Sequence, residues 1–91
     1  MHPADAGGGL RQGVGALRGE EQAVGEQFGR NLSEAREWEG LTQAELAERA
    51  AMPVREVVRL EQGHGCPRLD KVVRLADVVQ VQVRDLLYGI E

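Results

Sequence analysis

The sequence predicts a small all-α fold, in which one compact domain of five short helices follows a glycine-rich tail. Two observations support this prediction. Apolar residues recur at helical spacing from Phe28 onward, and glycines or prolines separate the periodic stretches. With 91 residues the chain is expected to form one domain, and with only 3% aromatic residues its core must be mainly aliphatic.

The glycines divide the chain into two parts. Eight of the 12 glycines lie within residues 1–29, among few large apolar residues. Glycine disfavours helix by about 1 kcal/mol at each interior position. We therefore expect a disordered tail over residues 1–25 and the helical domain over residues 26–91.

The first two helices are predicted from spacing and from a capping signal. Phe28, Leu32 and Ala35 share one helical face, and this first helix is expected to end near Gly40. The second helix is expected over residues 42–50. Its first residue, a threonine, is followed three positions later by a glutamate, which is the pattern of a capping box.

The remaining three helices follow from prolines, glycines and apolar spacing. A third helix begins at Pro53, where proline is tolerated, and ends at Gln62 before a glycine. A fourth is expected over residues 69–79 and a fifth over residues 83–88. The apolar stripe expected to face the core from the fourth helix consists of Leu69, Val72, Val73, Ala76 and Val79.

Two short helices joined by a tight turn have the layout of a helix-turn-helix. The run Leu-Thr-Gln-Ala-Glu-Leu-Ala at 41–47 is followed, at a specific distance, by Leu-Glu-Gln-Gly at 60–63. With these motifs, residues 28–88 resemble the lambda-repressor/Cro-like helix-turn-helix domain, the XRE family. Further matching residues are Arg36, Gly40, Val57, Arg59, Pro67, Leu69, Leu75, Ala76, Leu86 and Leu87.

The resemblance implies a DNA-binding surface and assigns residues to it. Val54, Arg55 and Arg59 match positions that contact base edges in the major groove, and arginine is the commonest partner of guanine there. Arg36 and Glu61 match a structural ion pair between the first and third helices. The residues expected near the sugar-phosphate backbone are Thr42, Gln43, Gln62, His64 and Gly65.

Several positions depart from the family pattern. Ala51 and Gln80 replace common turn glycines, which costs about 1 kcal/mol if the backbone there has positive φ. Pro53 replaces a serine or threonine cap, and Glu56 and Val58 do not favour DNA on this helix.

The charge does not by itself indicate nucleic acid. The net charge is −4, but residues 28–88 carry nine basic and ten acidic residues, so most of the excess lies outside them. The resemblance predicts a sequence-specific transcriptional regulator that binds double-stranded DNA as a homodimer, with Tyr88 and Ile90 as candidate dimer contacts. The alternative is a protein-interaction module with the same fold and little DNA affinity, contacting its partner through Val54 and Val58.

Other functions are not supported by the sequence. We expect no catalytic residues, because no pairing of nucleophile and base is visible. His64 and Cys66 do not make a metal-ligand set, so neither a metal nor a cofactor is expected. One cysteine and no long apolar run indicate a cytoplasmic protein rather than a membrane protein. Trp38, the single tryptophan, is expected to pack at the edge of the domain.

Overall fold

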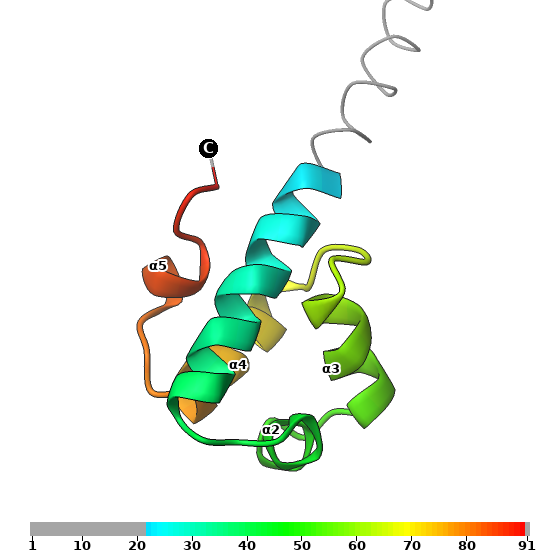
Figure 1. Cartoon of the computed structure of the whole chain (residues 1–91), viewed down its shortest axis with the longest axis vertical. Helices are drawn as coiled ribbons and strands as arrows, with labels where there is room; N and C mark the ends of the chain where they lie inside the picture. The colour runs from blue at the N-terminus through cyan, green and yellow to red at the C-terminus, as the bar shows by residue number, and fades with distance from the viewer. Residues whose placement is uncertain (1–21, 91) are drawn as a thin grey trace, which may run out of the picture.

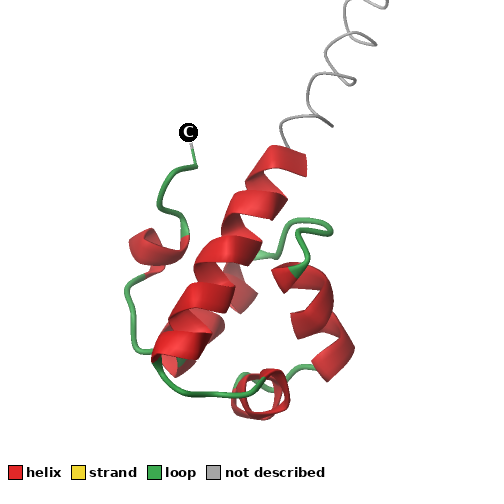
Figure 2. Ribbon diagram, viewed as in Figure 1, coloured by secondary structure: helices red, strands yellow, loops and turns green. Residues whose placement is uncertain are grey.

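The computed structural model describes residues 22–90, and every regular element in that range is a helix. The N-terminal helix occupies residues 22–38 of the described range. It is followed by α2 (Gln43–Arg49), α3 (Val54–Glu61), α4 (Leu69–Val78) and α5 (Val83–Leu86). The N-terminal helix runs through the middle of the domain, with α3 on one side and α5 on the other (Figures 1 and 2). The predicted five-helix, all-α fold is confirmed.

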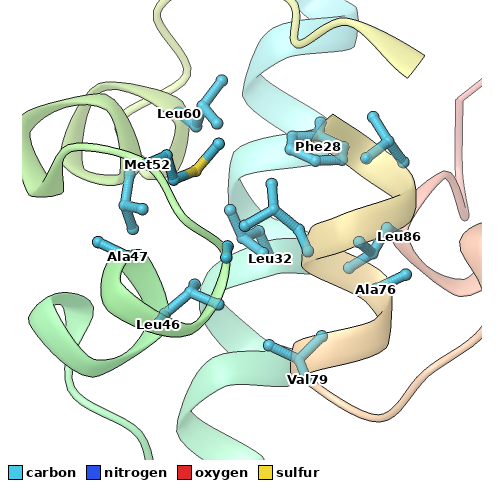
Figure 3. Packing of buried hydrophobic residues seen from close by; sticks show 13 residues of the cluster. Phe28, Leu32, Leu46, Ala47, Met52, Leu60, Ala76, Val79 and Leu86 are labelled. Carbon is cyan, nitrogen blue, oxygen red and sulfur yellow. The ribbon is translucent and has the colours of Figure 1, made fainter. Parts of the chain in front are cut away.

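The core lies between the N-terminal helix, α2, α3 and α4, and Leu86 of α5 packs into it (Figure 3). Phe28 and Leu32 of the N-terminal helix, Leu46 of α2 and Leu75 of α4 are at most 1% exposed. Phe28 is its one aromatic side chain, so the prediction of an aliphatic core holds. Among the described residues, no helix is both long and apolar enough to cross a bilayer.

The predicted start of α2 is confirmed in detail. The Thr42 hydroxyl accepts a hydrogen bond from the Glu45 backbone N–H at 3.0 Å, and the Glu45 carboxylate accepts one from the Thr42 N–H at 2.8 Å. Helix α3 begins directly after Pro53, which provides no side-chain cap. Ala51 and Gln80, the two departures from turn glycine, do adopt positive φ, at 58° and 64°.

The N-terminal helix differs from the sequence prediction at its start. It already includes residues 22–25, which had been assigned to the tail, whereas residues 1–21 lie outside the described residues. The reason is packing: Gly25 and Gly29 are both buried against the end of α3 and the loop that follows it. Gly25 therefore belongs to the domain, as Gly29 does, and not to the tail.

Three apolar side chains that were expected to pack against the domain are exposed. In α4, Leu69 is 71% and Val73 49% exposed, because the stripe that packs inward is Val72, Leu75, Ala76 and Val79. Trp38 is 89% exposed, so its predicted edge packing is wrong. It is the last residue of its helix and extends beyond the core. Near the C-terminus, Leu86 is buried, whereas the adjacent Leu87 is 39% exposed.

Candidate nucleic-acid interface

Helix α3 has one buried face and one exposed face. Val57 and Leu60 pack into the core, while Arg55 and Arg59 on the other face are exposed and lie one helical turn apart. Val54, in the first turn, is 47% exposed. The three residues predicted to contact bases therefore share an accessible face of the helix that follows the turn.

A hollow of about 280 Å³ lies between α3, α4 and the loop that joins them. Arg59, Arg68 and Lys71 line it together with His64 and the acidic Glu56. The three cations outnumber the one carboxylate, so we call this lining the basic hollow. Arg55 does not line this hollow and lies one turn further toward the start of α3.

Glu56 is the acidic residue of α3 that, from the sequence, does not favour a DNA contact. Its carboxylate forms an ion pair with the Lys71 ammonium of α4, and both side chains are about 30% exposed. The pair neutralises Glu56 and links α3 to α4. It also means that Lys71 is a weaker partner for phosphate than an unpaired lysine would be.

A largely buried ion pair joins the N-terminal helix to the end of α3. The Arg36 guanidinium donates from Nε to Glu61 Oε2 at 2.6 Å and from Nη2 to Oε1 at 3.1 Å. The side chains are only 13% and 6% exposed. This hydrogen bond to Glu61 raises the pKa of Arg36 above its ordinary value, with the charges of Glu61 and Glu37 adding to the effect. The predicted Arg36–Glu61 pair is confirmed.

The same carboxylate holds the start of α2. Gln43 donates from Nε2 to Glu61 Oε1 at 2.9 Å, and Arg36 donates from Nη1 to the Leu41 carbonyl at 2.8 Å. The N-terminal helix, the segment entering α2 and the end of α3 thus share one polar network. Nothing in the sequence indicated that Gln43 bonds Glu61, because the two residues are 18 positions apart.

The residues predicted near phosphate fall into two groups. The amide nitrogen of Gln43 is engaged with Glu61, and the Thr42 hydroxyl caps α2, so both have structural partners in this state. The second group, Gln62, His64 and Gly65, is exposed at the end of α3 and in the following loop. Arg59 and Arg68 are exposed beside this second group, and Arg68 forms an exposed ion pair with Asp70 at 3.4 Å.

A metal site is not evident in the part of the chain that the structure describes, since no three His, Cys, Asp or Glu side chains gather within reach of one ion. His64 and Cys66 line the basic hollow together, and Cys66 is exposed.

Comparisons with known proteins give the same picture. A family model described as a helix-turn-helix domain matches residues 27–87. Among solved structures, the restriction-modification controller protein C.AhdI from Aeromonas hydrophila has a TM-score of 0.68 and 30% sequence identity. That match covers 70% of this chain and 97% of the controller protein.

A second solved structure matches over only part of its length. The apo form of the competence regulator ComR from Streptococcus vestibularis has a TM-score of 0.68 and 26% identity. The match covers 75% of this chain and 23% of ComR. No curated protein matches the chain.

Proposed function

The chain belongs to the helix-turn-helix domain family, of the lambda-repressor/Cro-like type, and from this premise we propose that it is a sequence-specific transcription regulator of double-stranded DNA. The observation that carries the proposal is the exposed face of α3, with Arg55 and Arg59 one turn apart. An α-helix fits the major groove, and arginine forms two hydrogen bonds to guanine O6 and N7 there.

Each exposed side chain of α3 has a role in this proposal. Arg55 and Arg59 contact guanine, and Val54 contacts a thymine methyl group. Both solved relatives carry regulator or controller in their names, which supports the same class for this chain.

The surroundings of α3 supply the contacts that do not depend on sequence. Gln62, His64 and Gly65 approach the sugar-phosphate backbone, together with Arg68 across the basic hollow. Such contacts orient the protein on the duplex without selecting bases. Glu56 pairs with Lys71, so fewer cations are available to neutralise DNA phosphates. We therefore expect weak nonspecific binding with a shallow salt dependence.

A homodimer is part of the proposal. Two recognition helices about 34 Å apart reach successive major grooves on one face of the duplex, so the preferred site has approximate twofold symmetry. Sedimentation in the presence of the selected site measures the stoichiometry, and one protein per site would contradict this part.

The test is selection from genomic DNA fragments at low and near-physiological salt, with wild type and an Arg55→Ala/Arg59→Ala variant. The wild type is expected to enrich a common site, and the variant to lose that preference. Arg30→Ala/Arg84→Ala is the matched control, because it removes the same charge from exposed positions outside α3. The control should select the same site as the wild type.

Two results would overturn the assignment of α3. One is a wild type that enriches no sequence at either salt concentration. The other is an Arg55→Ala/Arg59→Ala variant that selects the same site equally well. Equal weakening in the control variant would indicate that total charge, and not base contact, determines binding.

A protein-interaction module is the second candidate, favoured by the 47% exposure of the apolar Val54 at the start of α3. The proposed apolar strip is short, since Val58 is half-buried. Val54→Ser distinguishes the two functions. On a protein contact it weakens partner binding at all salt concentrations, whereas at a thymine methyl it changes the preference at one base pair.

A further inference from the structure

A second hollow lies on the other side of the N-terminal helix, away from α3. It has a volume of about 370 Å³ and is lined by residues of the N-terminal helix, the loop before α5, α5 itself and the segment after it. Trp38 and Tyr88 both line it and are 89% and 79% exposed, the two most exposed large apolar side chains among the described residues. Large aromatic side chains at a surface are typical anchors of protein contacts.

The hollow is held in shape before any partner arrives. Asn31 of the N-terminal helix donates from Nδ2 to the Leu86 and Tyr88 carbonyls, each at 2.8 Å. Its Oδ1 in turn accepts a hydrogen bond from Gln27 at 2.9 Å. The backbone that carries Tyr88 is thus fixed to the helix that carries Trp38, which reduces the ordering cost of binding.

The charge of this hollow is acidic. Glu34 and Asp85 line it and are exposed, and no lysine or arginine is part of the lining. The nearest cations along the chain line other surfaces or are paired: Arg84 lines a neighbouring hollow, and Arg36 is engaged with Glu61. Carboxylates beside an aromatic face form a setting in which a guanidinium or ammonium group is favoured, through ion pairing and cation–π contact.

We propose that the hollow bounded by Trp38 and Tyr88 is a docking site for an arginine- or lysine-bearing segment of another protein. Its place in the fold suits a regulator, because α5 and α3 lie on opposite sides of the N-terminal helix (Figure 1). A partner bound here leaves the exposed face of α3 accessible. The proposal does not depend on DNA binding and can fail or succeed separately from it.

A second copy of the chain is the competing occupant, and the charges disfavour it. A twofold contact through this surface would bring Glu34 and Asp85 of both copies together, and like charges across an interface are unfavourable. The candidate dimer contact at Tyr88 therefore conflicts with this proposal. The experiment below distinguishes binding of a basic segment from binding of a second copy of the chain.

The single tryptophan makes the site its own reporter. We would titrate the full chain with a capped tri-arginine peptide and follow Trp38 emission, with a tri-glutamate peptide as the negative control. The arginine peptide is expected to change the emission saturably, and added salt should weaken its binding. Glu34→Lys, at an exposed position, is expected to weaken binding about tenfold by reversing the local charge.

Glu48→Lys is the matched control, since Glu48 is also exposed but lies on α2, outside the hollow. It should bind the peptide as the wild type does, and unchanged circular dichroism shows that both variants fold. The proposal is overturned if the arginine peptide leaves Trp38 emission unchanged or if Glu34→Lys binds equally well. It is also overturned if Trp38 emission shifts to the blue with protein concentration alone while the chain sediments as a dimer, because the second copy is then the occupant.

Discussion

The N-terminal helix is held differently on its two sides. Toward α3 it makes close backbone contact through Gly25 and Gly29 and a buried ion pair through Arg36. Toward α5 the polar contact is a single side chain, Asn31, which holds the C-terminal segment by two hydrogen bonds. The first side thus combines close backbone packing with an ion pair, whereas on the second side only Leu86 of α5 is fully buried and Trp38 is exposed.

This difference separates the orientation of the recognition helix from the shape of the outer surface. Helix α3 must be oriented precisely if its arginines are to meet base edges, and a buried network with closely packed backbone provides that precision. The surface at α5 has no such requirement and can change with less effect on the core. Substitutions on the α3 side should therefore lower the free energy of unfolding of the whole domain. Substitutions on the α5 side should lower only the stability of the C-terminal segment.

The largest expected effect is that of Glu61→Ala. It leaves the Arg36 guanidinium, only 13% exposed, without its carboxylate and also removes the partner of Gln43. Breaking a buried pair by removing one member is expected to destabilise the domain by about 3 kcal/mol. Urea unfolding followed by circular dichroism measures the change in the free energy of unfolding.

The double variant Arg36→Met/Glu61→Leu is the matched control. Because no charge is left buried, it should recover most of the lost stability, although it lacks the hydrogen bonds that orient the start of α2. An unchanged midpoint for Glu61→Ala would contradict the structural role of the pair. If the double variant is stable but has lost sequence selection, the network acts on the orientation of α3.

The second largest effect is expected for Gly29→Ala. A Cβ at this position would lie 2.4 Å from the Leu60 carbonyl oxygen and 2.8 Å from that of Glu61, so the N-terminal helix must move away from α3. In an open helix the same change is stabilising by about 1 kcal/mol. Here we expect a destabilisation of about 2 kcal/mol, measured by urea unfolding.

Gly40→Ala is the comparison for this glycine. Gly40 has φ +74° and open space around it, so alanine there costs backbone strain of about 1 kcal/mol without any clash. If Gly29→Ala stabilised the domain, the close approach between the N-terminal helix and α3 would be wrong.

The packing of these glycines also shows which features of the fold could not be predicted from the sequence. The helices and the capping box were predictable, because each depends on residues near one another in the chain. The positive φ of Ala51 and Gln80 was suggested only by the family resemblance, through the turn glycines that these residues replace. The sequence pattern assigns Gly25 to the tail and predicts no packing role for Gly29, at the start of the expected domain. Their role depends on carbonyl groups more than 30 residues away, which composition does not reveal.

The candidate site was predictable to the same extent. Spacing placed Arg55 and Arg59 on one face of α3, and the resemblance identified the Arg36–Glu61 pair. The ion pair of Glu56 with Lys71 and the hydrogen bond from Gln43 to Glu61 both link different helices. The spacing of residues within one helix therefore cannot predict them. Helical spacing was equally unable to tell that Val73 lies outside the buried stripe of α4, because that depends on which neighbour each face meets.

A smaller and local effect is expected for Asn31→Ala on the α5 side. The variant loses the two bonds to the Leu86 and Tyr88 carbonyls, at a cost of about 1–2 kcal/mol because these groups are partly exposed to water. Amide hydrogen exchange should accelerate at residues 86–90 and stay unchanged in α3. Equal acceleration in both regions would show that the two sides of the N-terminal helix are not energetically separate.

The smallest effect concerns Glu45, an exposed carboxylate that contrasts with the buried Glu61. Hydrogen bonds from the Thr42 backbone N–H and hydroxyl hold the pKa of Glu45 below its ordinary value of 4.5. A carboxyl group whose pKa is lowered on folding stabilises the fold above its unfolded pKa, and that contribution is lost as pH falls through the folded pKa.

Glu45→Gln should therefore lower the melting temperature at pH 7, but by less than Asn31→Ala lowers it. The difference from wild type should be constant down to about pH 5 and should shrink in more acidic solution. Glu48→Gln is the charge-matched control, because it removes the same charge from an exposed position of α2 outside the capping box. A Glu45→Gln difference that grew below pH 4.5 would mean that the charge of Glu45 opposes folding, in contradiction to the capping geometry.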